Sequence, residues 1–308
     1  MQRPATELIA ERFSSRTYVP APIGPGLLEP LLDSLRASVA GPFGSPARFV
    51  LIVASEQEPD LLKGLGTYGF IKGATGFIAG AVQRGPRDME DYGYLLEQIV
   101  LSATELGLGT CCLGGTFTKS AFADRLRLTP EESMPAIVAV GHIDATATRE
   151  QVHRRPLSQR LPAGQLFFEG RFGTPMAAAV AGGGPGDEYG DGLVPRLLEA
   201  VRWSPSASNK QPWRVVRVGD DWHFYLQRTK GYGKGSLLFA ALRLADLQRV
   251  DMGIAMCHFE LAARELGLTG GWVVDQPRIE LPGPQTEYTA TWRATRVDSM
   301  SGERLSAG

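Results

Sequence analysis

The sequence predicts an α+β fold built from two tandem halves, which are related by a pseudo-twofold axis within one chain. A long helical pattern occurs over 91–108 and again over 251–268, an offset of 160 residues. Eight of these eighteen aligned positions are identical, namely Asp, Gly, Leu, Ala and the closing Glu-Leu-Gly-Leu, where chance would give about one. A Gly/Ala-rich stretch with little apolar content separates the two halves. The pattern therefore indicates a duplicated unit.

The same order of elements recurs around each repeated helix. Helix, loop and strand are expected at 27–39, 41–47 and 48–53 in the first half, and at 193–203, 204–213 and 214–218 in the second. Further apolar strands are expected at 77–82 and 136–143. We therefore divide the chain into a first half (1–172), a linker (173–192) and a second half (193–308).

The ends of the two repeated helices carry recognisable signals. Each pattern opens on an aspartate, Asp91 or Asp251, which suits the N-cap position of a helix. Each closes at a glycine, Gly107 or Gly267, which can adopt the left-handed conformation just after a helix end. We expect both helices to begin and end at these residues.

Composition limits the classes of partner. Of 308 residues 43% are hydrophobic, which is enough for a sizeable core, and 32 basic residues nearly cancel 33 acidic ones. No overall field therefore recruits nucleic acid or a membrane surface. The N-terminus lacks the apolar core of a signal peptide, and no apolar run reaches about 18 residues. We expect a cytoplasmic protein that binds neither partner.

The three cysteines do not indicate a disulfide framework or a metal site. Cys111 and Cys112 are adjacent, and Cys257 is distant from both. Cys257 precedes His258, but neighbours on a helix point about 100° apart and no second ligand pair has metal-binding spacing. We expect reduced, buried thiols and no metal.

The run S-P-S-A-S-N-K-Q-P-W-R at 204–214 is difficult to explain by packing alone. Its small hydroxyl residues, amides and proline are expected to leave backbone N–H groups open for a ligand. It resembles the P-S-x-x-N-x-Q-P-W loop by which flavin-dependent nitroreductases contact FMN across their dimer interface. The alternative is a Ser/Asn turn with Trp213 as a core anchor. The resemblance implies that Pro205, Ser206, Ala207 and Asn209 cover the flavin.

The tandem arrangement resembles one group within this family. Nitroreductases are normally homodimers with FMN at the subunit boundary, whereas here two nitroreductase-like halves lie in one chain. The chain is similar to the fused group, in which both subunits form an intramolecular pseudo-dimer. This implies the nitroreductase fold in each half and a monomeric protein.

The resemblance also implies which residues hold the phosphate of FMN. Arg12, Ser14 and Arg16 match the R-x-S-x-R entry motif of the family. Arg154 and Arg155 stand before a proline, like the basic pair that completes the phosphate site. A buried phosphate needs such arginine forks and hydroxyls to replace its water. The alternatives are the solvated end of a helix for the first motif and a surface charge cluster for the second.

The flavin ring is expected beside a glycine-rich turn at 106–117. In the family, amides of this turn face flavin O4 and N5, which makes Gly114 and Gly115 the candidates here. Relatives often carry an aromatic residue where Cys112 stands, so this wall of the site is expected to be smaller. Lys72 is a hypothetical neighbour of flavin N1 and O2, where negative charge accumulates upon reduction. A plain turn and a solvated lysine are the alternatives.

The function implied is FMN-dependent oxidoreduction. NAD(P)H would reduce the flavin and a nitroaromatic or quinone would reoxidise it at the same face, in a ping-pong scheme. The second half lacks an R-F-S-S-R motif and the first half lacks S-A-S-N-K-Q, so we expect one FMN per chain and a vacant or degenerate mirror-image site. An FMN carrier or sensor without turnover and a flavin-free scaffold remain alternatives.

Overall fold

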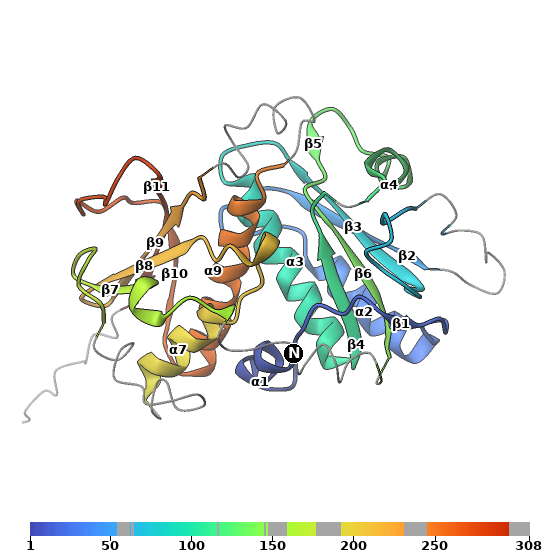
Figure 1. Cartoon of the computed structure of the whole chain (residues 1–308), viewed down its shortest axis with the longest axis horizontal. Helices are drawn as coiled ribbons and strands as arrows, with labels where there is room; N and C mark the ends of the chain where they lie inside the picture. The colour runs from blue at the N-terminus through green and yellow to red at the C-terminus, as the bar shows by residue number, and fades with distance from the viewer. Residues whose placement is uncertain are drawn as a thin grey trace, which may run out of the picture.

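The computed structural model describes residues 1–53, 62, 65–115, 117–144, 146, 159–176, 192–230 and 245–295. These residues form two α+β units that lie side by side and meet along two long helices (Figure 1). Within the described residues, no helix combines the length and the apolar character needed to cross a membrane. The predicted linker is described only at its two ends.

The first unit has three layers. Its helices are α2 (Pro25–Ala37), α3 (Asp88–Glu105) and α4 (Lys119–Leu126), and its strands are β1 (Tyr18–Val19), β2 (Ala47–Val53), β3 (Gly76–Gln83), β4 (Leu108–Leu113), β5 (Glu132–Ser133) and β6 (Ile137–Ile143). The four long strands are antiparallel in the order β4-β6-β3-β2. Helices α2 and α3 pack on one face of this sheet and α4 packs on the other. Because both faces are covered, β3 is apolar and buried along almost its whole length.

The second unit repeats this topology. Its elements are α7 (Leu193–Arg202), η3 (Ala207–Asn209), β8 (Trp213–Val218), β9 (Asp221–Gln227), α9 (Leu247–Glu265), β10 (Gly270–Val273) and β11 (Thr286–Ala294). The antiparallel order β10-β11-β9-β8 matches β4-β6-β3-β2 strand for strand. The α+β fold of two tandem halves is therefore confirmed.

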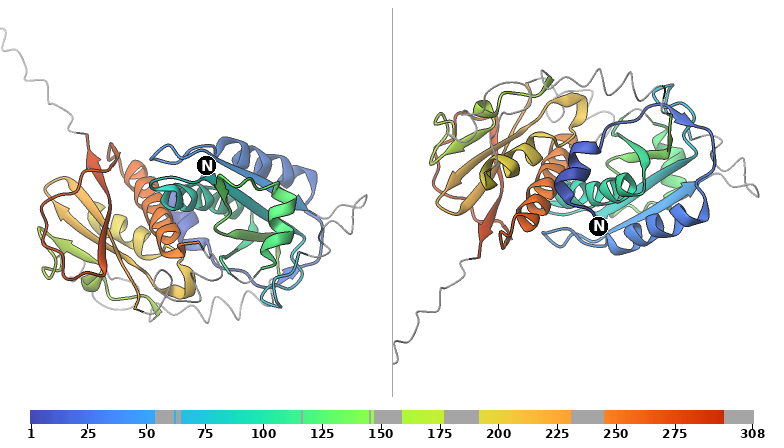
Figure 2. Two further views of the ribbon diagram at one scale, coloured as in Figure 1. Left: turned by 90° about the horizontal axis from the view of Figure 1, so that it is seen from above. Right: turned by 90° about the horizontal axis from the view of Figure 1, so that it is seen from below.

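Two segments of the predicted first half join the second unit. The N-terminal helix α1 (Ala5–Glu11) packs Leu8 and Ile9 into the core beneath the second sheet. Far along the chain, β7 (Phe167–Glu169), which follows η2 (Ala163–Gln165), adds a parallel edge strand to β8. Both units thus share chain segments, and the views from above and below show α1 against α9 (Figure 2).

The two repeated helices cross at a pair of equivalent glycines. A Cβ atom added to Gly93 of α3 would overlap the carbonyl of Val250, and one added to Gly253 of α9 would overlap the carbonyl of Glu90. Gly93 and Gly253 are 160 residues apart, so they occupy the same place in the two units. Only glycine allows the backbones to approach this closely. The pseudo-twofold axis therefore passes near this crossing.

The predicted helix starts were wrong and the predicted helix ends were right. Helices α3 and α9 are capped by Arg87 and Asp246, so Asp91 and Asp251 lie inside the helices. Gly107 and Gly267 follow the helix ends with φ of 74° and 81°, as expected for left-handed C-terminal residues.

The two aspartates hold loops instead of starting helices. The carboxylate of Asp91 accepts hydrogen bonds from the amides of Phe43 (2.9 Å) and Ser45 (2.8 Å) in the first-half loop. Asp251 accepts one from the amide of Ala207 (3.0 Å) in the second-half loop. Each repeated aspartate thus connects a central helix to the loop before β2 or β8.

Candidate functional site

The N-terminal segment brings three predicted residues together. The amide of Ser15 donates to the carbonyl of Thr110 on β4 (2.8 Å), while the amide of Lys72 donates to the carbonyl of Arg16 (2.9 Å). Ser14, Arg16 and Lys72 are exposed side by side along this segment. Among the described residues, the side chains of Arg16 and Lys72 have no hydrogen bond or ion pair. Two free cations and a hydroxyl thus lie at one edge of β4.

Arg12 is buried without a hydrogen-bond acceptor. Its side chain is 5% exposed, and its Nε lies 3.5 Å from Glu97 Oε1 without forming a hydrogen bond. Within the part of the chain that the structure describes, no other group accepts from its guanidinium. Burying a guanidinium, which has five donors, with so few partners is unfavourable. An anion at this site would supply the missing acceptors.

Cys112 marks where the two units meet. Its thiol is buried, which raises its pKa, and the nearby charges of Glu97 and Asp251 raise that pKa further while Arg12 lowers it. These groups come from the N-terminal segment, α3, β4 and α9. The predicted residues of the first half therefore face Asp251, which holds the loop of the second half.

The stretch 106–117 is mostly a strand and not the turn that we expected. Residues 108–113 form β4, which pairs with β6, because their alternating apolar side chains fill both faces of the first sheet. Gly114 and Gly115 follow the strand. A Cβ atom on Gly114 would overlap the side chain of Leu247 at the start of α9, whereas one on Gly115 would meet no atom within 4 Å. Gly115 therefore borders open space beside the interface of the two units.

The loop 204–212 is organised by its own polar groups. Ser206 Oγ accepts from the amide of Gln211 (2.9 Å), and the amide of Ala207 donates to Asp251. Ser208 and Asn209 have left-handed φ values of 52° and 53°, which side chains of this type tolerate. The expectation of open backbone N–H groups was wrong for Ala207, Asn209, Lys210 and Gln211, whose amides are all paired. A tight bend with left-handed residues needs these bonds to hold its shape.

A second segment fastens the same loop from behind. Arg160 donates to the carbonyls of Ser204 (2.7 Å) and Trp203 (3.1 Å), and its guanidinium lies 5.6 Å from the centre of the Trp203 ring. The side-chain amide of Asn209 donates to the carbonyl of Gln159 (2.9 Å). Pro205, Ser206 and Ala207 remain half-buried, and Asn209 remains exposed. The loop is thus a rigid edge of the second unit.

Several functional residues were not predicted, and some predicted ones cannot be placed. Arg154 and Arg155 lie outside the described residues. Glu97, Arg160 and the ligand-facing role of Asp251 were missed, because each acts on a residue far away in the sequence. The only sequence signal was the repetition of Asp91 as Asp251.

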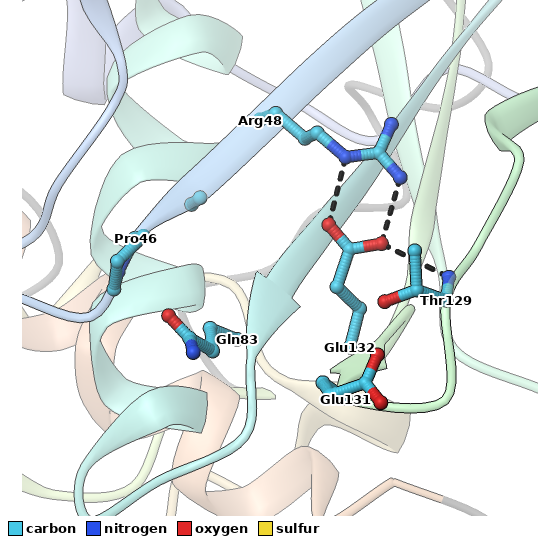
Figure 3. Close-up of a pocket in the computed structure, with 7 residues that line it drawn as sticks. Pro46, Arg48, Gln83, Thr129, Glu131 and Glu132 are labelled. Atoms are coloured by element: carbon cyan, nitrogen blue, oxygen red, sulfur yellow. Dashed lines mark hydrogen bonds and ion pairs between the residues drawn. The ribbon is translucent and has the colours of Figure 1, made fainter.

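A cavity elsewhere in the first unit does not require a ligand. It has a volume of about 270 Å³ and lies beside Arg48, whose guanidinium forms a two-pronged pair with Glu132 (2.7 Å for each bond) (Figure 3). Arg48 also donates to the carbonyl of Leu126. Its charge is already neutralised, and none of the predicted site residues lines this cavity.

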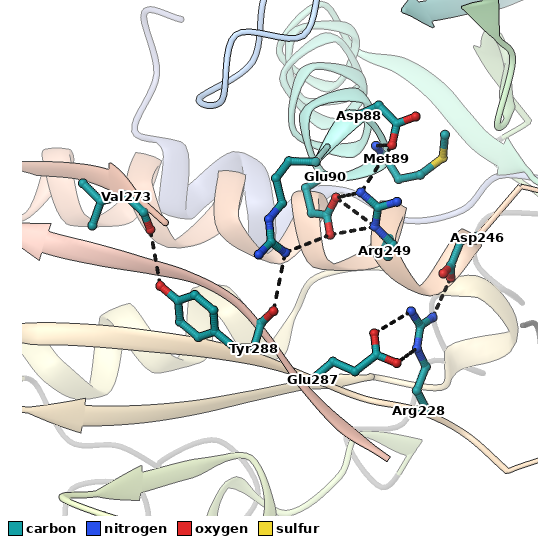
Figure 4. Close-up of polar contacts among 10 residues, drawn as sticks. Asp88, Met89, Glu90, Arg228, Asp246, Arg249, Val273, Glu287 and Tyr288 are labelled. Atoms are coloured by element: carbon teal, nitrogen blue, oxygen red, sulfur yellow. Dashed lines mark hydrogen bonds and ion pairs between the residues drawn. The ribbon is translucent and has the colours of Figure 1, made fainter. Parts of the chain in front are cut away.

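The mirror-image position in the second unit is filled by protein groups. Val274 and Asp275 stand 160 residues after Gly114 and Gly115. The hydroxyl of Tyr288 accepts from the amide of Asp275 (3.1 Å) and donates toward backbone carbonyls of β10 and the residues after it. Figure 4 shows Tyr288 beside Val273, with Arg87 bonded to its carbonyl. The amide that corresponds to Gly115 is therefore occupied.

Comparisons with known proteins agree with this architecture. A family model described as "Putative TM nitroreductase" matches residues 5–166 and 187–263, which is more than half of the chain. A crystal structure of a "putative nitroreductase" from Thermotoga maritima has a TM-score of 0.56 at 18% identity, and the alignment covers 95% of this chain and 94% of that one. At this identity the likeness shows the fold, here over both units.

Two further solved structures are similar over about half of this chain. An "oxidoreductase containing FMN" is 21% identical with a TM-score of 0.45, and covers 56% of this chain and 96% of that one. A protein from Desulfovibrio desulfuricans in complex with FMN is 24% identical with a TM-score of 0.38, and covers 52% and 95%. No functionally curated protein matches the chain in sequence.

Proposed function

The chain belongs to this nitroreductase family, and from that membership we propose that it is an FMN-dependent oxidoreductase, which passes electrons from NAD(P)H to a small electrophilic acceptor. One observation carries the proposal. The buried guanidinium of Arg12 has no acceptor among the described residues, and it lies next to the segment that presents Ser14 and Arg16. A phosphate monoester would satisfy these donors.

The residues present fit FMN as well as its phosphate. Arg12, Ser14 and Arg16, with Arg154 and Arg155, would hold the phosphate. Gly114, Gly115 and Cys112 would border the ring from the first unit, and the loop residues Pro205, Ser206, Ala207 and Asn209 would cover it from the second. The open space at Gly115 and the fixed shape of the loop support this assignment. The filled mirror-image position supports one FMN per chain.

Bound FMN would supply the hydride chemistry, and the protein would supply orientation and electrostatics. Lys72 has an exposed ammonium group with no partner among the described residues, and it would support negative charge on the nearby ring edge. The backbone bonds that join Lys72 to Arg16 and Tyr18 hold it in place. No side-chain acid or base is required for this role.

The class of acceptor follows from the surface near Lys72. Tyr68 and Phe70 are 71% and 51% exposed, two and four residues before it. Exposed aromatic side chains favour binding of flat, apolar molecules. We therefore propose nitroaromatics or quinones as acceptors, with NADH or NADPH as the donor.

The proposal is tested by flavin binding and reduction. The purified protein is saturated with FMN, freed from excess by gel filtration, and its bound flavin is measured by absorbance; we expect one FMN per chain. Anaerobic addition of NADH and of NADPH should then remove the visible flavin absorbance. Protein that stays colourless would favour a flavin-free scaffold, and bound FMN that neither donor reduces would favour a carrier or sensor.

A further inference from the structure

A chain of buried polar groups links Arg12 to the second unit. Glu97 of α3 and His258 of α9 are both fully buried, and His258 Nε2 lies 2.9 Å from Glu97 Oε1. The other ring nitrogen, Nδ1, lies 2.9 Å from the carbonyl oxygen of Ala200 on α7. Glu97 Oε1 is also the atom nearest to Arg12, at 3.5 Å. Three helices from both units therefore meet behind the guanidinium of Arg12.

The hydrogen bonds determine how charge is shared in this chain. The carbonyl of Ala200 can only accept, so His258 Nδ1 carries a hydrogen. A distance of 2.9 Å between Nε2 and Oε1 then requires one proton between those two atoms, whichever of them holds it. With that proton, the His258–Glu97 pair has no net charge. The positive charge of Arg12 is then not cancelled.

No other described group near Arg12 cancels its charge. Burial raises the pKa of the Cys112 thiol and of the Cys257 thiol, so both are neutral near pH 7. Burial also raises the pKa of Asp251. Without the proton on His258, Glu97 would be the one anion next to Arg12 and would neutralise it.

The pair exists on one side of the pseudo-twofold axis only. The positions 160 residues away from Glu97 and His258 are Cys257 and Gln98. Neither of these residues can carry the same charges, and no arginine corresponds to Arg12 in the second half. The charged arrangement is therefore specific to the side of the molecule that carries the phosphate-binding motif.

We propose that His258 and Glu97 are a positioning pair, which keeps the positive charge of Arg12 available for the phosphate of the cofactor. This inference rests on the proposed function. It adds a residue of the second unit to phosphate binding, although His258 itself does not touch the ligand. The second unit would thus contribute to both ends of the cofactor.

The test compares FMN with riboflavin, which lacks the phosphate. Dissociation constants for both are measured by flavin fluorescence with the full-length protein and with His258→Gln and Glu97→Gln. His258→Gln leaves Glu97 charged, so FMN binding should weaken about tenfold while riboflavin binding changes less than about twofold. Glu97→Gln removes the opposing charge and should leave FMN binding at least as tight as in the wild type.

Two further variants separate this role from a purely structural one. In an Arg12→Ala background, His258→Gln should cause no additional loss of FMN selectivity. Glu260→Gln is the matched control, because Glu260 is a buried carboxylate with its own partners, Tyr94 and Trp272. It should lower stability without changing the ratio of the two dissociation constants.

The outcomes distinguish the inference from the proposed function. Equal weakening of FMN and riboflavin by His258→Gln, or selective weakening of FMN by Glu97→Gln, would overturn the inference. If His258→Gln does not fold, Glu97→Gln with the doubly substituted protein gives the same decision, since the double variant should bind FMN as the wild type does. A wild-type protein that binds neither flavin would overturn the proposed function itself.

Discussion

At the level of single residues, Arg12 and Asp251 share an unusual property. Both are buried, and each has a polar atom without a partner: Arg12 Nε and Asp251 Oδ2. Buried polar groups are normally paired, and exceptions concentrate at functional sites. Asp91, the equivalent of Asp251, uses both of its oxygens. The incomplete pairing is thus confined to the side of the axis where we propose the cofactor.

Asp251 should make stability depend on pH. Burial raises its pKa well above the ordinary 3.8, so the folded protein keeps this proton at a pH where the unfolded chain has lost it. The free energy of unfolding therefore falls as pH rises above about 4, by about 1.4 kcal/mol per pH unit until the folded-state pKa is reached. Asp251→Asn cannot ionise and keeps an oxygen for the Ala207 amide, so its stability relative to the wild type should increase with pH.

Urea unfolding at several pH values measures this difference. Asp33→Asn, at an exposed position on α2, is the control for the loss of one aspartate. A stability difference between Asp251→Asn and wild type that stays constant from about pH 4 to pH 7 would contradict the prediction.

At the level of elements, the crossing of α3 and α9 sets the relation between the two units. The helices approach through Gly93 and Gly253, and ion pairs surround their N-terminal ends, among them Arg249 with Glu90 (Figure 4). Because α9 also carries Asp251 and His258, its position relative to α3 determines the geometry of the candidate site. A change at the crossing should therefore be felt at the site.

Gly253→Ala should destabilise the protein strongly. The added methyl group would overlap the backbone of α3, which cannot move aside as a flexible side chain can, and we expect a cost of about 3 kcal/mol or more. Gly26→Ala is the matched control, since Gly26 is a helical glycine with no atom within 4 Å of an added Cβ. It should stabilise by about 0.5 kcal/mol. Thermal unfolding measures both, and equal melting temperatures for the two variants would refute the packing argument.

The sequence predicted elements better than it predicted their contacts. The strands at 77–82 and 136–143 were found because apolar side chains that cover two faces of a sheet leave a continuous pattern. The ends at Gly107 and Gly267 were found because glycine meets a local backbone requirement. The assignment of 106–117 as a turn was wrong because its glycines suggested a bend, whereas pairing with β6 made most of it a strand.

At the level of the whole molecule, the two units exchange segments. Helix α1 precedes the first unit in the chain but packs against α9 and α7 in the second, and β7 completes the second sheet. Such exchange joins the units more firmly than a linker alone. The N-terminal phosphate-binding motif follows α1 directly, so its position depends on the core of the other unit.

Leu8→Ala should therefore weaken the second unit more than the first. Leu8 is fully buried in the core that contains α7 and α9, and its truncation should cost about 3 kcal/mol. Hydrogen exchange of backbone amides should increase mainly in α7 and α9. Leu193→Ala, at a position that is 39% exposed, should cost less than about 1 kcal/mol. An increase confined to α2 and α4 would show that α1 stabilises the first unit instead.

The sequence by itself determined that the chain is a duplicated α+β unit of the nitroreductase type, because repeated identities and apolar periodicity are local properties of the chain. Only the tertiary structure decided that Asp91 and Asp251 hold loops, that α1 and β7 cross between units, and that His258 lies behind Glu97 and Arg12. These contacts join residues that are distant in sequence. Their partners are selected by the packing of α3 against α9 and not by any local pattern.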